Sequence, residues 1–281
     1  MSEFDIEERT RSKVEEIASS IKMQWCTPTY DGKILLLVED QDDKNCYFKF
    51  FNYDLVEIRT SAGCNKMRHL FDILRLYSIP LFAIQDSDFA RVCDKIPKEE
   101  NYFITDCHDH EMMCLNNPKV MKAIFVNNAV NYDLELVKSA FDYLRMLSHF
   151  KWYNYKYHLN VNFRGYKVCG KKKEELCSFD AIYNTVKPHS PKCTSLIKEF
   201  HINDFIKEQN RQSDFELTNG HDFLDLMTQL IEEKYNLHGK IKNNLRTIMY
   251  SSFTLDCFKD TNLYRNVYTW AGEKADVLFV S

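Results

Sequence analysis

Four acidic residues follow two apolar runs in the first third of the chain, and residues of this type could hold a metal ion. The runs are 34–38 and 81–84, and the acids after them are Glu39, Asp43, Asp86 and Asp88. If the two runs lie side by side as strands, these carboxylates converge and repel one another unless a cation neutralises them. Carboxylate oxygens are hard ligands, which Mg²⁺ and Mn²⁺ prefer. The sequence therefore predicts a Mg²⁺ or Mn²⁺ site.

An acidic residue at the end of a strand can instead cap the next helix or solvate a loop, because carboxylates are common in first helical turns. We favour that alternative for Asp42, Asp106 and Asp109. Glu39 differs from them, since it directly follows a five-residue aliphatic run, and burying a carboxylate without a partner is costly. The predicted metal site therefore centres on Glu39.

The segments around these acids predict an α/β fold. An apolar run such as the one before Glu39 is typical of a strand that is buried on both faces of a parallel sheet. Alternating strands and helices indicate a parallel sheet flanked by helices, with right-handed crossovers. Ligands bind outside the carboxyl ends of the strands in such sheets, which is where the acids lie. The expected strands are 33–39, 55–60, 81–84 and 102–105, and the expected helices between them are 42–51 and 65–77.

The rest of the chain is predicted to be mostly helical. An amphipathic helix is expected at 4–25, and the sequence pattern changes at about residue 119. We therefore expect an α/β core with the N-terminal helix in residues 1–118 and a mostly helical second region in residues 119–281. In the second region, helices are expected at 133–150, 194–208, 222–235 and 237–250, a strand at 159–168, and an exposed charged stretch at 171–181.

The composition is that of an ordinary globular protein, with 44% hydrophobic and 28% charged residues. A net charge of −4 gives no broad electrostatic footprint for nucleic acid, so a nucleic-acid enzyme of this charge needs local basic patches. No apolar run approaches the ~20 residues of a membrane span, and we expect no membrane association and no export signal. Ten cysteines without paired spacing then indicate reduced thiols in the cytoplasm.

A series of short motifs adds a family resemblance. The motifs are LLVEDQDD at 36–43, FF at 50–51, AGCNK at 62–66, AIQDSDF at 83–89, TDCHDHE at 105–111 and NGHD at 219–222. A strand that ends in Glu, with a later strand that ends in Asp-x-Asp, resembles the TOPRIM domain of topoisomerases, primases and OLD-type nucleases. The full order resembles the TOPRIM-like family that contains the AriB effector of the PARIS anti-phage system.

The resemblance implies a TOPRIM-like sheet and metal-assisted cleavage of phosphodiester bonds in DNA or in structured RNA such as tRNA. Glu39, Asp86 and Asp88 would form the core metal site, with Asp43 beside them and Glu111 as an additional acidic residue near the same edge. Glu39 would act as a metal ligand or general base. His108 and His110 suit either proton transfer beside these acids or structural hydrogen bonds.

The resemblance also implies a phosphate site, a partner and a role. Lys66 and Arg68 begin the helix after Gly63, where a helix N-terminus could receive a phosphate, although a solvated helix surface is an equal alternative. The implied role is that of a toxic nuclease effector of an anti-phage system. A partner ATPase would hold it inactive, and it would act as a homodimer. The chain departs from the pattern at Asp40, where many TOPRIM domains have Gly.

Two other functions remain open at this point. In the first, the altered loop at Asp40 has lost its chemistry, and the helical region docks a partner as an interaction module. In the second, Asp86 is the nucleophile of a phosphatase-like hydrolase. The second is disfavoured, because the Thr/Val pattern expected after Asp86-Ser-Asp88 is absent and Glu39 would have no role.

Overall fold

The structure is a computed structural model that describes residues 3–61, 63–209, 212–237, 239, 241 and 244–280. The chain forms two compact units. The sheet unit comprises Met1–Asp86, Pro97–Thr105 and Leu255–Ser281, and the helical unit comprises Ser87–Ile96 and Asp106–Thr254. This division differs from the boundary predicted at residue 118, because the chain passes between the units four times.

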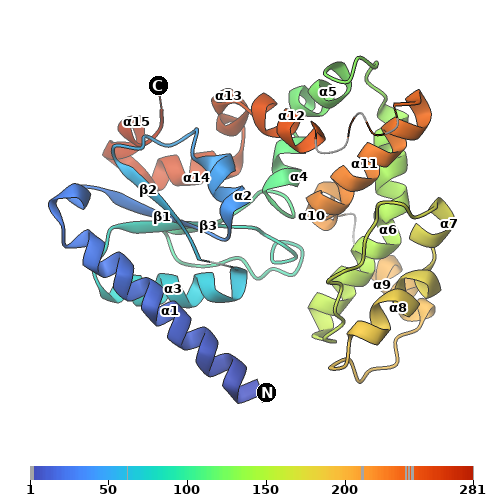
Figure 1. The fold of residues 1–281 in the computed structure, drawn as a ribbon, viewed down its shortest axis with the longest axis horizontal. Coiled ribbons are helices and arrows are strands. Elements are labelled where there is room, and N and C mark those ends of the chain that lie inside the picture. Colours follow the sequence, from blue (N-terminus) through green and yellow to red (C-terminus); the bar gives the residue numbers. More distant parts are fainter. Residues whose placement is uncertain are drawn as a thin grey trace. The chain divides into compact units, whose positions relative to one another are not determined.

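The sheet unit contains a four-stranded parallel sheet with the strand order β2-β1-β3-β4, of which β2, β1 and β3 are labelled in Figure 1. The strands are β1 (Ile34–Val38), β2 (Val56–Thr60), β3 (Leu81–Gln85) and β4 (Tyr102–Ile104). All five residues of β1 are buried, as expected for a central strand covered on both faces. The predicted α/β class is confirmed, and β1 and β3 are neighbours, with Leu36 opposite Phe82.

One face of the sheet packs against α1 (Glu3–Trp25) and α3 (Cys64–Leu76), both close to their predicted bounds. The apolar stripe of α3 is fully buried, because its residues recur at helical spacing and meet alternate residues of β1 and β3. The core of this face includes Val14, Ala18, Leu35, Leu37, Met67, Leu70, Phe71, Leu74 and Ala83.

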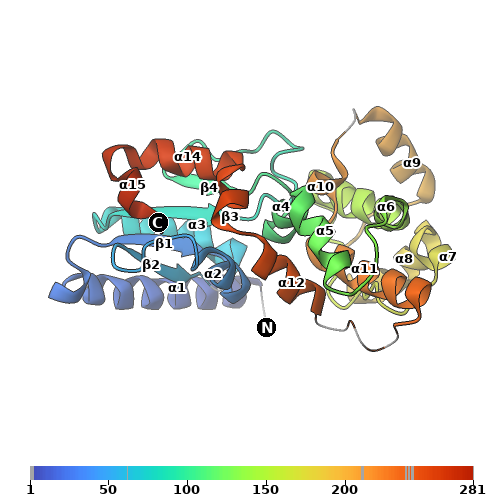
Figure 2. The same ribbon diagram turned by 90° about the horizontal axis from the view of Figure 1, so that it is seen from above.

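The other face of the sheet is covered by the C-terminal segment, which sequence analysis assigned to the helical region. This segment forms α13 (Leu255–Lys259), α14 (Asn262–Ala271) and α15 (Ala275–Leu278), and Figure 2 shows α1 and α14 on opposite sides of the strands. The rings of Phe82 and Trp270 lie 4.9 Å apart, and those of Phe51 and Phe279 lie 5.1 Å apart. Aromatic packing therefore joins the end of the chain to the sheet.

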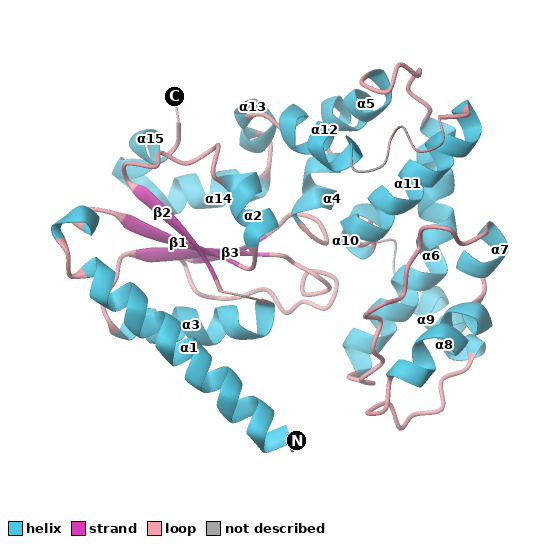
Figure 3. Ribbon diagram, viewed as in Figure 1, coloured by secondary structure: helices cyan, strands magenta, loops and turns pink. Residues whose placement is uncertain are grey.

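The described residues of the helical unit contain helices and loops but no strand (Figure 3). Two long helices, α6 (Leu134–Tyr157) and α11 (Gly220–Tyr235), end at a residue in the left-handed conformation. These C-cap residues are His158 (φ 52°) and Asn236 (φ 53°). The helices are α4 (His110–Leu115), α5 (Pro118–Val126), α6 (Leu134–Tyr157), α7 (Lys173–Leu176), α8 (Phe179–Val186), α9 (Glu199–Glu208), α10 (Asp214–Leu217), α11 (Gly220–Tyr235) and α12 (Asn244–Ser252). The helix predicted at 237–250 includes residues 238, 240, 242 and 243, which lie outside the described residues.

The strand predicted at 159–168 is wrong, and the segment is irregular. Its backbone is bonded by side chains rather than by a neighbouring strand. The Asn154 carboxamide oxygen accepts from the Val161 amide at 2.8 Å, and Ser190 Oγ accepts from the Asn162 amide at 2.8 Å. Apolar residues such as Val161 are buried in this loop, which explains why the segment has the composition of a strand.

The nine cysteines among the described residues form no disulfide with one another. No helix in the described ranges combines the length and apolar character needed to cross a bilayer.

Candidate metal centre

Two carboxylates meet at the carboxyl end of the parallel sheet. Asp86 follows β3, and Asp43 lies in α2 (Gln41–Tyr47), the helix after β1. A carboxylate oxygen of Asp43 lies within 4.8 Å of one of Asp86. Bonds of about 2.0–2.6 Å allow two oxygens on one ion to lie up to about 5 Å apart. The sheet unit therefore brings these two predicted ligands together at a spacing that one cation can bridge.

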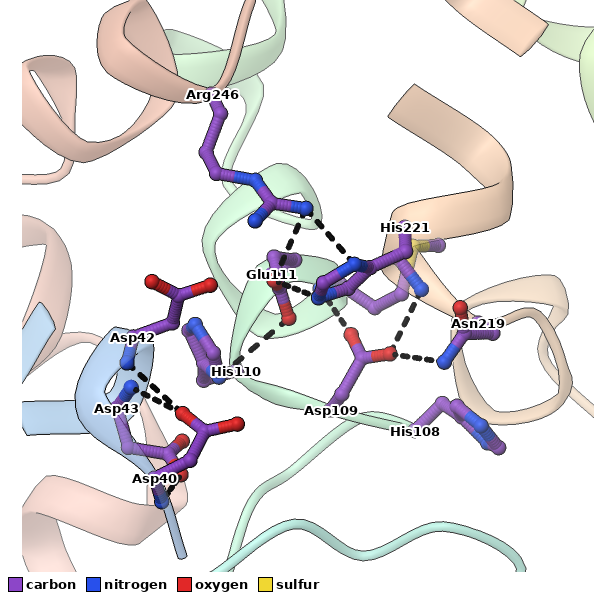
Figure 4. Close-up of polar contacts among 12 residues, drawn as sticks. Asp40, Asp42, Asp43, His108, Asp109, His110, Glu111, Asn219, His221 and Arg246 are labelled. Atoms are coloured by element: carbon purple, nitrogen blue, oxygen red, sulfur yellow. Dashed lines mark hydrogen bonds and ion pairs between the residues drawn. The ribbon is translucent and has the colours of Figure 1, made fainter. Parts of the chain in front are cut away.

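Asp43 is fixed by a capping box at the start of α2 (Figure 4). The Asp40 carboxylate accepts from the backbone amides of Asp42 at 2.8 Å and Asp43 at 3.2 Å, and the Asp43 carboxylate accepts from the Asp40 amide at 3.1 Å. These bonds satisfy helix N-terminal amides and hold the Asp43 side chain back toward the strand end. Asp43 is only 3% exposed, so its orientation is set by the fold.

Asp40 adopts an extended backbone, with φ −143° and ψ −168°. Any residue can take this conformation, so Asp in place of the usual Gly introduces no strain at the turn. Its carboxylate instead provides the helix cap, which glycine could not do. The acidic loop is thus a regular strand–turn–helix connection.

Glu39 is half-buried directly after β1. Its carbonyl oxygen accepts from the Gly63 amide at 3.1 Å and from Ser61 Oγ at 3.3 Å. Gly63 has φ 117°, which residues with a Cβ rarely adopt, and it stands at the N-cap of α3. The loop after β2 therefore fixes the backbone of Glu39 at the same edge of the sheet as Asp86.

Asp88 belongs to the helical unit, unlike the other three predicted acids. Its backbone is left-handed at φ 45°, and its amide donates to the His108 carbonyl at 2.7 Å. Partial burial raises the pKa of Asp88 to about 6, and the positive charge of Lys151 opposes that rise. Its side chain is still 49% exposed.

The two basic residues predicted to bind phosphate lie in α3 and differ from one another. Arg68 makes a bidentate ion pair with Glu99 and lies 3.5 Å from Asp72, so its charge is balanced within the sheet unit. The bond from Arg68 lowers the pKa of Glu99 to about 2. Lys66 is half-buried in the first turn, where its amide donates to the Gly63 carbonyl at 3.0 Å. Arg68 therefore has two carboxylate partners within the sheet unit.

Glu111, predicted as a further ligand, lies in the helical unit at the centre of an ion-paired network (Figure 4). It is 1% exposed. One oxygen lies 2.9 Å from His221 Nε2 and 3.9 Å from the Arg246 guanidinium, and the other lies 3.4 Å from His110 Nδ1. Burial alone would raise the pKa of Glu111, but His110, the hydrogen bond with His221 and the charge of Arg246 lower it. Both oxygens therefore face nitrogen-bearing side chains of the helical unit.

Asp109, predicted as a helix cap, indeed caps α4, and it also binds the start of α11. Its Oδ1 accepts from the Met112 amide at 2.8 Å, and its Oδ2 accepts from the Gly220 amide at 2.7 Å. A Cβ on Gly220 would lie 2.4 Å from Glu111 Cβ and 2.6 Å from Asp109 Oδ1. The TDCHDHE and NGHD motifs are therefore two halves of one packed structure, and burial raises the pKa of Asp109.

Sequence analysis did not identify the partners that complete this network. His221 follows the α11 cap, and Arg246 and Tyr250 lie in α12. Arg246 donates to His221 Nδ1 at 2.9 Å, and the Tyr250 hydroxyl lies 2.8 Å from His110 Nε2. No local pattern in α12 distinguishes these residues from an ordinary amphipathic helix surface.

Comparisons with protein-family models, curated proteins and solved structures found no match to this chain.

Proposed function

We propose that this protein is a TOPRIM-like nuclease that uses Mg²⁺ or Mn²⁺ to cleave phosphodiester bonds. The observation that carries the proposal is the approach of Asp43 and Asp86 to within 4.8 Å at the carboxyl ends of neighbouring parallel strands. Ligands bind at this edge in open α/β sheets, and an all-oxygen ligand set selects hard divalent cations.

The acids of the sheet unit have distinct roles in this proposal. Asp43 and Asp86 hold the ion, and Glu39 either completes the ligand set or accepts the proton of the attacking water. The ion supplies, when bound, polarisation of a phosphate oxygen and activation of that water. The capping box keeps Asp43 oriented before the ion arrives, so little reorganisation accompanies binding.

The substrate and the biological role follow from the motif resemblance. DNA and structured RNA such as tRNA are the two substrate classes, and a toxic anti-phage effector controlled by a partner ATPase, acting as a homodimer, is the role. The alternative of an interaction module relied on an altered loop at Asp40. The unstrained cap at that residue gives this alternative no support.

The test is a cleavage assay with DNA and total tRNA in the presence of Mn²⁺, Mg²⁺ or EDTA. Asp43→Asn and Asp86→Asn should each abolish cleavage. Asp54→Asn is the matched control, because Asp54 is an exposed acid at the opposite, amino-terminal end of β2. Titration with Mn²⁺ gives a second measurement that does not depend on the choice of substrate. Unchanged Mn²⁺ affinity in both Asn variants would refute the metal centre.

A further inference from the structure

A cleft of about 270 Å³ lies in the sheet unit beside the acidic edge. It is formed by α1, α2 and the end of β2, all within one unit. Its polar lining consists of Ser20, Gln24, Gln41, Lys44, Arg59 and Thr60. Among the described residues no carboxylate lines the cleft, so its chemistry is that of an anion site with two cations and several neutral hydrogen-bonding groups.

Arg59 is held in place on the wall of the cleft. Its Nη2 donates to Gln24 Oε1 at 3.0 Å and to the Tyr30 hydroxyl at 2.9 Å, and its Nε lies 2.9 Å from Glu57. These contacts orient the guanidinium without occupying all five of its N–H donors. An arginine that is already ordered loses little side-chain entropy when it binds a phosphate.

Lys44 supplies the charge that Arg59 cannot supply alone. Glu57 balances one positive charge, so Arg59 by itself leaves the cleft close to neutral. Within the described residues Lys44 makes no ion pair through its ammonium group. The cleft therefore carries a net positive charge in a protein whose formal net charge is −4. Such a local positive patch is what a polyanionic substrate requires on an acidic protein.

The cleft also has the right place and size for one phosphate group. Lys44 directly follows Asp43 in α2, and Thr60 pairs in register with Val38, the residue before Glu39. Neighbouring strands are about 4.8 Å apart, so the cleft lies one strand away from the acids along the same edge. Its volume is just below the roughly 300–1,000 Å³ of pockets for drug-sized ligands. A cleft of this size suits one sugar-phosphate unit of a strand rather than two nucleotides.

We propose that this cleft binds a backbone phosphate of the nucleic-acid substrate next to the phosphate that is cleaved, with Lys44 and Arg59 as its ligands. This proposal depends on the proposed function for the identity of the polymer. Lysine contributes a point charge, and the arginine fork contributes directed hydrogen bonds. A strand held in this way would run along the carboxyl edge of the sheet, across β1 and β2.

The test measures binding of labelled single-stranded DNA and tRNA to the Asp86→Asn protein in EDTA, by fluorescence anisotropy across a series of salt concentrations. Asp86→Asn removes one repelling charge and prevents cleavage. Adding Lys44→Gln should weaken binding by roughly 3–10-fold and lower the slope of log affinity against log salt by about 1. Lys49→Gln is the matched control, since Lys49 is exposed in the turn after α2 and does not line the cleft.

A second variant tests the geometry. Arg59→Lys retains the charge but loses the planar fork, so it should weaken binding while leaving the salt slope nearly unchanged. Melting temperatures of all variants establish that a loss of affinity is not a loss of folding.

The outcomes separate the two proposals. Wild-type affinity and slope in Lys44→Gln, or no binding of either nucleic acid by the Asp86→Asn protein, would overturn the phosphate cleft. If Asp43→Asn abolishes cleavage but Lys44→Gln leaves binding unchanged, the proposed nuclease activity is supported and the phosphate cleft is refuted. Cleavage that persists in the Asn variants, with binding that depends on Lys44, would overturn the metal centre alone. If a mononucleotide binds as tightly as the strand, the cleft serves a free nucleotide and the substrate subsite is refuted.

Discussion

The acidic residues of the sheet unit and those of the helical unit differ in what surrounds them. Asp43 lies within 4.8 Å of a second carboxylate, that of Asp86, so the neighbouring charge is of the same sign. Glu111 is equally buried, but it lies against His221, His110 and Arg246. Like charges at this distance are stabilised by a cation, whereas Glu111 already has its counter-charges. The identity of the nearest groups, and not burial itself, therefore distinguishes the candidate metal ligand Asp43 from the ion-paired Glu111.

The largest expected effect follows from removing an acid of the sheet unit. Glu39→Ala should abolish cleavage, with a loss of at least about 10²–10⁴-fold if Glu39 acts as the base. The melting temperature of the metal-free protein should stay the same or rise, because the change removes one negative charge from the sheet edge where the carboxylates of Asp43 and Asp86 already approach each other. A marked fall in melting temperature without metal would instead identify Glu39 as a structural residue.

The opposite result is expected at Glu111. Glu111→Ala should destabilise the protein by about 1–3 kcal/mol, because it removes the buried carboxylate that His221 and Arg246 contact, while these two partners remain partly exposed to water. Urea unfolding followed by circular dichroism measures this difference. Glu135→Ala is the control, since Glu135 is an acid at an equivalent early position of α6 that is exposed. Equal stability of the two variants would break the comparison between the units.

Much of the acidic edge could be predicted from the sequence, whereas the network around Glu111 could not. Continuous apolar runs mark β1 and β3 as buried parallel strands, and the carboxyl ends of adjacent strands meet by geometry. Glu111 and His221 are 110 positions apart, and their contact depends on how α4 and α11 pack. Local patterns do not encode such packing, so the sequence does not indicate the basic partners of Glu111.

The same limit explains the two errors in the fold. The segment 159–168 has the residue types of a strand, but Asn154 and Ser190 bond its backbone and no strand is beside it. The C-terminal helices have an amphipathic pattern that would suit either unit. Tertiary contacts, such as those of Phe279 with Phe51 and of Trp270 with Phe82, assign them to the sheet.

A third prediction concerns acid stability in the helical unit. His108 is 3% exposed, and burial, with a contribution from Lys151, lowers its pKa to about 4. The unfolded chain therefore binds a proton below its ordinary pKa of about 6.5, while the folded chain does not. Stability from this group is complete above pH 6.5 and falls as the pH drops toward 4, by about 3 kcal/mol in all.

His108→Phe provides the test of that prediction, because a second ring can pack against Phe89, whose ring lies 4.7 Å from that of His108. Unfolding free energies at pH 7 and pH 4.5 should fall less in the variant than in the wild type. Identical pH dependence in the two proteins would show that His108 is protonated in the fold.

A smaller effect is expected where α4 and α11 touch. Gly220→Ala should cost about 1–3 kcal/mol, because the added Cβ would overlap Glu111 Cβ and Asp109 Oδ1. Gly170→Ala is a useful contrast, since a Cβ there meets nothing within 4 Å, although its φ of 83° makes alanine strained. A Gly220→Ala protein that is as stable as the wild type would mean that the two motifs are not packed as described.

The smallest expected effect concerns the ion pair of Arg68 and Glu99. Like Glu111, Glu99 has a positively charged partner, but this pair lies near the surface. Both side chains are partly exposed, so Arg68→Gln should cost no more than about 1 kcal/mol. The Glu99 pKa of about 2 lies below its ordinary value of 4.5. The stability from this ion pair is therefore present above pH 4.5 and is lost as the pH falls toward 2.

Because the Arg68 charge is already balanced, Arg68→Gln should leave the affinity for nucleic acid and its salt slope close to those of the wild type, unlike Lys44→Gln. A fall in the salt slope of about 1 in Arg68→Gln would place a phosphate at α3 and show that a paired arginine can exchange its carboxylate for substrate.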